Sequence, residues 1–342
     1  MNILIITSNM GSINDGVGGY ANYLADAFCK LPEVQNVYKE SGETDSFGKK
    51  QMVFSMEMAN AIKRAIYKVK NGKVDTVIIE YPFKEYNPII IPLISSLKKE
   101  LHKRNGKFIL SLHEYFRAKK IRKIVMRKLV KMADYVFVTE KKIQNYFKQS
   151  KTNVYIRDIP SIIPVEWQKN ENKVFKKRKF IYFGLVIANK AFSEMIEAWK
   201  IFNKDGKYEL DIMTSSDIIL NEDEKYNIRL YKNLNDAEIA IRMKNATYCI
   251  LPIKPEIGMY NTTFKTATRS GCTIIGIFNE KFKNEKFAVD IKSYSTDDFV
   301  KGLKYASNLD EVSLKDNATE AIKFGERYSF EHTARQIVDK LI

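Results

Sequence analysis

The sequence is poor in cysteine and in histidine, with three of each among 342 residues. The cysteines, Cys29, Cys249 and Cys272, lie far apart within apolar patterns. This placement disfavours a disulfide framework or a zinc site and is typical of small buried side chains. The histidines show no paired spacing, which gives little support to a metal site built from protein side chains. We therefore expect no metal and no resident cofactor.

Long apolar runs are also missing. No stretch approaches the ~18 to 20 uninterrupted apolar residues that a membrane span needs. The apolar start NILIIT is too short for a signal peptide and lacks a basic region before it. We expect a cytoplasmic protein, and the length and 45% hydrophobic content favour two domains of roughly 150 to 180 residues.

Acidic residues are scarce relative to basic ones: 41 against 57, which gives a net charge of +16. Between Lys98 and Lys131 the sequence has thirteen Lys or Arg residues but only Glu100 and Glu114 as acids. Such a surface predicts a negatively charged partner. Nucleic acid is the obvious alternative, but no helix-turn-helix, zinc finger, RRM or KH pattern is present, so we expect no nucleic acid partner.

Short β runs alternate with helical patterns along both halves of the chain. In the first half the runs are NILIIT, DTVIIEY, KFILSLH and DYVFVT; in the second they are KFIYFG, YELDIM, NIRLY, YCIL and CTIIGIF. This rhythm predicts an α/β fold with two Rossmann-like parallel sheets, each covered on both faces. We expect domains at 1–163 and 179–328, a polar linker at 164–178, and a closing helix at 329–342 that returns to the first domain.

Glycines follow the first strand in the segment GVGGYA, residues 16–21, and the first helix is expected from Tyr20. The segment satisfies a dinucleotide-binding spacing, yet Thr7 to Asp15 separate it from the strand, which disfavours NAD or FAD. Two interpretations stay open. The glycines let the loop turn into a helix, or their backbone N–H groups approach an anion.

Polar residues also stand where other predicted strands end. His113 and Glu114 follow the run FILSL, and the segment Glu80–Pro82 ends the preceding strand. After the strand YCIL, a loop with Glu256 leads into a helix that starts near Asn261 to Thr263. Open α/β sheets bind ligands at this edge, and a helix N-terminus suits an anion. A loop histidine and a plain helix cap are the alternatives.

These positions resemble GT-B glycosyltransferases of the family-4 type. The resemblance implies donor-binding roles for the pair Gly18 and Gly19, for Gly184 with Lys190 six positions later, and for Glu256, Asn261, Thr262 and Thr263. It also implies catalytic roles for His113, Lys190 and Glu256. A UDP- or GDP-sugar would donate its sugar to a glycan or lipid-linked glycan with retained configuration and without a metal.

The sequence departs from the family pattern at two places. Leu185 to Ile187 occupy the positions where the family commonly has an arginine, and Lys265 and Arg269 are the candidate substitutes. Phe264 occupies the position of a second glutamate, unless two inserted residues bring Thr266 there. The departures leave open a second interpretation: a degenerate GT-B protein that binds a nucleotide sugar, or a partner subunit, without chemistry.

The helical segment from Lys119 to Met132 completes the expected acceptor side. Helical periodicity predicts a buried stripe of Ile121, Ile124, Val125, Leu129 and Met132, with a dense basic arc around it. A solvated face is the plain interpretation of the arc; anionic lipid headgroups on the inner membrane face are the functional one. The residues assigned to the acceptor or membrane side are Tyr81, Glu114, Lys119, Lys120, Lys123 and Arg127.

Overall fold

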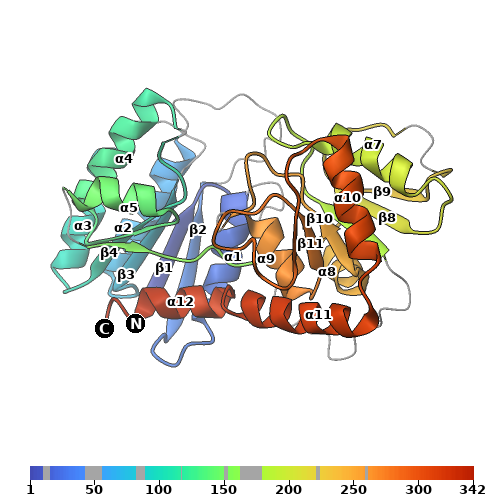
Figure 1. Cartoon of the computed structure of the whole chain (residues 1–342). Helices are drawn as coiled ribbons and strands as arrows, with labels where there is room; N and C mark the ends of the chain where they lie inside the picture. Colours follow the sequence, from blue (N-terminus) through green and yellow to red (C-terminus); the bar gives the residue numbers. More distant parts are fainter. Residues whose placement is uncertain are drawn as a thin grey trace. The chain divides into compact units, whose positions relative to one another are not determined.

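The computed structural model describes residues 1–10, 16–42, 56–81, 89–116, 118–149, 153–161, 179–220, 224–258 and 261–342. The chain forms two compact units, one of Met1–Ile159 with Phe330–Ile342 and one of Pro160–Ser329 (Figure 1). The expected linker, 164–178, lies outside the described residues.

The first unit is a parallel sheet between two layers of helices. Its strands are β1 (Asn2–Thr7), β2 (Asn36–Ser41), β3 (Thr76–Tyr81), β4 (Lys107–Leu112), β5 (Tyr135–Val138) and β6 (Val154–Ile156), in the order β2-β1-β3-β4-β5-β6. Its helices are α1 (Gly16–Phe28), α2 (Glu57–Lys70), α3 (Ile90–His102), α4 (Lys120–Met132), α5 (Lys141–Lys148) and α12 (Phe330–Val338).

Alternate strand residues of this sheet enter two separate apolar cores. Ile3 and Ile5 pack with α1 and α12, whereas Leu4 and Ile6 pack with the core that contains α2 to α5. Because neighbouring side chains on a strand point to opposite faces, a sheet covered on both sides needs apolar residues in succession. The continuous run TVIIEY of β3, buried at every position, meets that requirement.

The second unit has the same layered plan. Its strands are β7 (Lys179–Phe183), β8 (Glu209–Thr214), β9 (Ile228–Lys232), β10 (Tyr248–Ile250), β11 (Thr273–Gly276) and β12 (Ala288–Asp290), in the order β12-β11-β10-β7-β8-β9. The helices are α7 (Phe192–Phe202), α8 (Asp236–Asn245), α9 (Thr262–Arg269), α10 (Thr296–Ser307) and α11 (Glu311–Glu326). The paired strands of both sheets run parallel, which confirms the predicted fold class.

Several elements have no counterpart in the sequence prediction. The edge strand β2 carries the polar run NVYKES, and β6 and β12 are three residues long, so none gives a clear apolar alternation. The helices α2, α10 and α11 also went unassigned. The first helix begins at Gly16 rather than at the expected Tyr20, which places Gly18 and Gly19 in its first turn.

The buried face of α4 differs from the predicted stripe. Met126, Leu129 and Val130 are buried, whereas Ile121 is 69% and Ile124 is 49% exposed. The prediction was wrong for these two isoleucines. The predicted stripe and the buried residues Met126, Leu129 and Val130 both recur at helical spacing, and only packing against the sheet decides which apolar face is buried. Across the described residues, every helix is too short or too polar to span a bilayer.

Candidate active site

The second sheet changes its direction of growth between β7 and β10. The chain adds β8 and β9 on one side of β7, and β10, β11 and β12 lie on the other side. Ligands of open α/β sheets bind outside the carboxyl ends of the strands at such a point. Gly184 follows β7 there, and the loop from Leu251 to Gly258 follows β10.

Gly184, Lys190 and Thr263 lie together at this edge. Gly184 has φ +136°, a conformation that favours glycine, and a Cβ on it would stand 2.7 Å from Lys190 Nζ and 3.8 Å from Thr263 Oγ1. Lys190 Nζ donates to the Tyr182 hydroxyl at 3.4 Å and lies 5.4 Å from the centre of its ring. A β-bridge between Lys190 and Ile253 ties the two loops together.

The ammonium of Lys190 is only partly hydrated. Burial lowers the pKa of Lys190 below its ordinary value. Among the described residues, no acidic side chain forms an ion pair with it. An anionic ligand would therefore supply the counter-charge that the described residues do not provide here.

The helix α9 begins beside this lysine. Its N-cap residue, Asn261, does not cap the helix with its side chain; Asn261 Oδ1 accepts a hydrogen bond from the Gly258 N–H at 2.7 Å instead. Thr262 and Thr263 are half-buried in the first turn, where helix N–H groups lack acceptors within the helix. Glu256 is half-buried in the preceding loop.

The suggested substitutes for the missing arginine do not lie at this edge. Lys265 is completely buried with its Nζ 4.9 Å from the Tyr328 ring centre, and buried Arg269 donates to the Gly325 carbonyl at 3.4 Å. Thr266, the suggested replacement for the second glutamate, is buried and bonds to Thr262 and Ser161. These side chains pack α9 into the unit, since every residue of the helix from Phe264 to Arg269 is buried.

In the first unit, His113 is the residue after β4 and belongs to a buried polar cluster. Its Nε2 lies 2.7 Å from Glu80 Oε2, and the same oxygen accepts from Ser111 Oγ at 2.5 Å. Parallel pairing places Glu80 beside Ser111, and the His113 N–H extends the ladder to the Tyr81 carbonyl at 3.0 Å. The register of β3 and β4 thus positions the whole pair.

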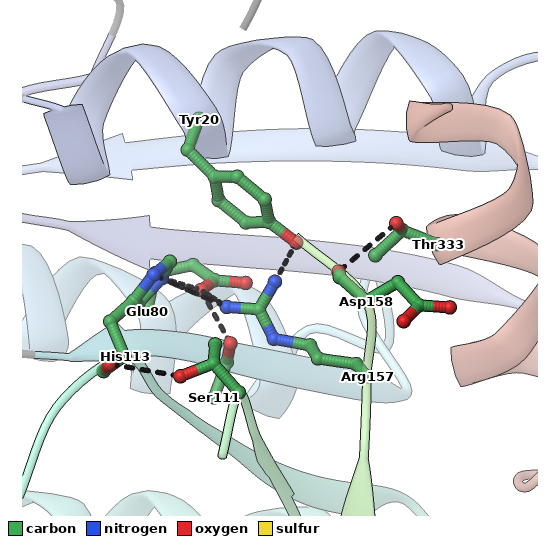
Figure 2. Close-up of polar contacts among 8 residues, drawn as sticks. Tyr20, Glu80, Ser111, His113, Arg157, Asp158 and Thr333 are labelled. Atoms are coloured by element: carbon green, nitrogen blue, oxygen red, sulfur yellow. Dashed lines mark hydrogen bonds and ion pairs between the residues drawn. The ribbon is translucent and has the colours of Figure 1, made fainter. Parts of the chain in front are cut away.

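Arg157, just after β6, supplies the positive charge of this cluster. Its Nη2 lies 3.3 Å from Glu80 Oε2 and 3.0 Å from His113 Nε2, and its Nη1 donates to the Tyr20 hydroxyl. Figure 2 shows the guanidinium between Tyr20 and the Glu80–His113 pair. Arg157 and Glu80 are completely buried, and the His113 side chain is 17% exposed.

The charges of the cluster set its protonation. Burial alone raises the pKa of Glu80, but Arg157, His113 and Ser111 bring it below its ordinary value. Burial and the Arg157 charge lower the pKa of His113, although Glu80 and Glu114 oppose them. The cluster therefore contains a carboxylate, a guanidinium and a neutral imidazole.

Other expected residues of the first unit have different places. Tyr81 is 1% exposed in the apolar core, which corrects its assignment to the acceptor side: β3 is buried on both faces. Gly18 is buried, and a Cβ on it would lie 1.7 Å from the Asn9 carbonyl oxygen, so close packing of loop on helix requires glycine there. Glu114 is half-exposed and pairs with Arg122 at 3.2 Å.

Sequence reasoning missed Arg157 and Tyr20, the two partners that complete the cluster. Arg157 follows the short strand VYI and is 77 positions from Glu80. A lone arginine at the end of an apolar run was the available signal, but its partner depends on strand order. In the described part of the chain, no group of three or more His, Cys, Asp or Glu side chains is placed to hold a metal ion.

Two parallel-sheet units with these strand orders define the GT-B class of fold. Among solved structures, the chain is similar to an α-glucosyltransferase in complex with UDP-glucose and DNA (12% identity, TM-score 0.70, 99% of this chain and 98% of that one). It is also similar to WaaG, a glycosyltransferase involved in lipopolysaccharide biosynthesis (11%, 0.61, 99% and 99%), and to a glycosyltransferase from Rickettsia africae (12%, 0.69, 99% and 97%). No protein-family model and no curated protein matches the sequence.

Proposed function

We propose that this protein is a glycosyltransferase that moves a sugar from a UDP- or GDP-sugar to a hydroxyl of a glycan or lipid-linked glycan. The proposed reaction retains the configuration of the sugar, needs no metal, and belongs to the synthesis of surface polysaccharide or glycoconjugates. The observation that carries the proposal is the grouping of Gly184, Lys190 and the start of α9 at the switch point of the second sheet.

The chemistry of the donor explains why this grouping is suitable. Transfer breaks the bond between the anomeric carbon and a diphosphate oxygen and forms a bond to the acceptor oxygen. Negative charge therefore grows on the departing nucleoside diphosphate. Lys190 and the N-terminal dipole of α9 would stabilise that charge where a metal ion does so in other transferases.

His113, Glu256 and the glycines have supporting roles in the proposal. His113 would contact hydroxyls of the transferred sugar, and Glu256 would bind the donor from the loop before α9. Gly19, half-buried in the first turn of α1, remains the glycine through which backbone N–H groups could approach the diphosphate. Gly18, by contrast, is explained by its packing against Asn9.

Donor binding is the direct test of this function. We expect UDP- or GDP-sugars to raise the melting temperature of the protein and to release free UDP or GDP in the presence of an acceptor, measured over a panel of sugars. Several solved structures of similar fold hold UDP or UDP-glucose, so UDP-sugars come first in the panel. Binding without release would favour the degenerate partner subunit, and no binding of any nucleotide sugar would overturn the proposal.

The acceptor side is proposed to contact an anionic membrane surface on its cytoplasmic face. Exposed on α4 and just before it are Lys119, Lys120, Arg127, Lys128 and Lys131. Lys123 is half-buried, and its Nζ lies 5.8 Å from the Tyr115 ring centre. A groove of about 460 Å³ beside the helix is lined by Ile124, Arg127, Lys128, Lys131, Tyr146, Phe147 and Gln149.

The exposed apolar side chains favour lipid over nucleic acid as the partner. Ile121, Ile124 and Tyr146, the last 39% exposed, lie among the basic residues of α4 and α5. A bilayer surface accepts both kinds of side chain, since apolar groups enter the interface while Lys and Arg meet the headgroups. A phosphate backbone would use only the charges.

We expect alanine at Lys119, Lys120, Arg127 and Lys128 together to weaken binding to vesicles of phosphatidylglycerol and phosphatidylcholine. Each lost basic residue removes about 1 kcal/mol of attraction. Serine at Ile121 and Ile124 should weaken binding further at equal charge. Vesicle flotation at low and moderate salt measures both effects.

The matched control replaces four exposed lysines of the second unit, Lys301, Lys304, Lys315 and Lys323, and should leave flotation unchanged. If the wild-type protein does not float with anionic vesicles at low salt, the membrane proposal is wrong. The membrane proposal is also wrong if the protein binds duplex DNA through Lys119, Lys120, Arg127 and Lys128 and vesicles compete poorly with the DNA.

A further inference from the structure

The contacts of His113 select one tautomer of its ring. Nε2 lies 2.7 Å from a carboxylate oxygen of Glu80, which can only accept, so the ring hydrogen belongs on Nε2. Arg157 Nη2 lies 3.0 Å from Nε2 and 3.4 Å from Nδ1, so the guanidinium faces both ring nitrogens and does not itself distinguish them. A neutral imidazole carries a single ring hydrogen, so with Nε2 donating to Glu80 the lone pair belongs to Nδ1.

The groups around the ring oppose a second proton. The positive charge of Arg157 beside the ring lowers the pKa of His113. The negative charges of Glu80 and, at greater range, Glu114 raise it. From α1, Tyr20 meets His113 edge-on with ring centres 4.9 Å apart, and burial raises the pKa of the Tyr20 hydroxyl, which stays neutral. Thr139, the residue after β5, donates through its Oγ1 to the His113 carbonyl at 3.0 Å and leaves the ring nitrogens untouched.

Within the described chain, the cluster contains buried polar atoms without hydrogen-bond partners, which are unfavourable for stability. Glu80 Oε1 and Arg157 Nε are buried and have no hydrogen-bond partner among the described residues. Buried polar groups without a partner are rare in folded proteins, and a catalytic role is one of the explanations for them. Apolar side chains of similar volume would pack this place without an unsatisfied charge.

We propose that Glu80 and Arg157 are positioning residues that hold His113 as the neutral Nε2–H tautomer, so that Nδ1 accepts a hydrogen bond from a substrate hydroxyl. This inference rests on the proposed sugar transfer for the identity of the hydroxyl. The control of the His113 tautomer by Glu80 and Arg157 requires no substrate. Glu80 orients the ring, and Arg157 prevents its protonation as the pH falls.

The state of the ring can be measured directly in the whole protein. Labelling histidine with ¹⁵N gives three side chains to assign, His102, His113 and His332, and a variant of each identifies its signals. We expect His113 at neutral pH to show a protonated Nε2 and an unprotonated Nδ1. An imidazolium, or a hydrogen on Nδ1, would overturn the proposal without any other variant.

Two substitutions should move the His113 titration in opposite directions. Glu80→Gln removes the attracting charge and should shift the midpoint to lower pH; Arg157→Gln removes the repelling charge and should shift it to higher pH, with Arg157→Lys closer to wild type. His102, on the opposite edge of the sheet beside Asp134, provides the reference signal that is compared between the folded variants. Equal or absent shifts would contradict the proposal, and Glu80→Gln alone decides it if Arg157→Gln does not fold.

Transfer activity gives a second, separable readout. The acid limb of kcat/KM should follow the His113 midpoint of each variant. If the proposed transfer fails, this limb cannot be measured, but the NMR result stands. If transfer occurs and neither Glu80→Gln nor Arg157→Gln shifts the acid limb of kcat/KM, the positioning role is wrong while the proposed function remains.

Discussion

Lys190→Ala is expected to lower the rate of sugar transfer by about 10²- to 10³-fold, the usual effect of removing one preorganised group that stabilises developing charge. The side chain reaches the carboxyl end of β7 with its Nζ against the Tyr182 hydroxyl, and no described acid neutralises it. Its charge should therefore matter most as the diphosphate departs. Initial rates of nucleotide release, with kcat and KM separated, measure the effect.

A matched control distinguishes this role from a general loss of charge. Lys315→Ala removes an exposed lysine of α11 that pairs with Glu311 and should leave the rate unchanged. Gly184→Ala perturbs the same site in a second way, since the Cβ of the alanine would stand 2.7 Å from Lys190 Nζ. Gly206→Ala, at a positive φ with only Lys225 O nearby at 3.9 Å, controls for backbone strain. Normal rates in Lys190→Ala would exclude the assigned site.

Arg157→Leu is expected to destabilise the first unit by about 3 to 5 kcal/mol, because it leaves the carboxylate of Glu80 buried without its partner. Both side chains are completely buried, so solvent does not screen the pair. Hydrogen exchange of peptides from β3, β4 and β6 in the whole chain measures the loss in this unit. Peptides of the second sheet provide the internal reference.

Two further variants test the electrostatic origin of that loss. Adding Glu80→Gln to Arg157→Leu should recover part of the stability, since the uncompensated charge disappears. Glu331→Gln breaks the Lys30–Glu331 pair on the surface of the same unit and should cost at most about 1 kcal/mol. Strictly additive losses in the double variant would mean that packing, and not charge, causes the effect.

The pH dependence of stability follows from the same cluster. The folded pKa of Glu80 lies below its ordinary value of 4.5, and that of His113 lies below 6.5. In both cases the unfolded chain binds the proton first as the pH falls. The cluster therefore stabilises the fold near neutral pH and loses that contribution in acid, below about 6.5 for His113 and below about 4.5 for Glu80.

Much of the fold could be predicted because its signals are local. Val77, Ile78 and Ile79 are apolar at successive positions, which suits a strand buried on both faces, and the helix predicted to start near Asn261 to Thr263 begins at Thr262. Elements that rely on their neighbours were missed. The strand β2 is polar in sequence and is extended because it pairs with β1.

The candidate site divides in the same way. That His113 and Gly184 follow strands, and that a helix starts after Asn261, could be predicted from residues adjacent in the chain. That Arg157 meets Glu80, that Lys265 is buried, and that Ile121 is exposed could not. Strand order and the rotation of each helix decide these contacts, and both depend on packing between distant segments.

By itself, then, the sequence determined an α/β chain with polar residues at the ends of apolar strands, because side-chain alternation and backbone conformation are set by near neighbours. Only the tertiary structure decided which of those residues share a site. It joined Lys190 to Gly184 and Thr263, and it enclosed His113 between a carboxylate and a guanidinium. Charges act through space over a few ångströms, and only the folded sheet brings residues 77 positions apart to that distance.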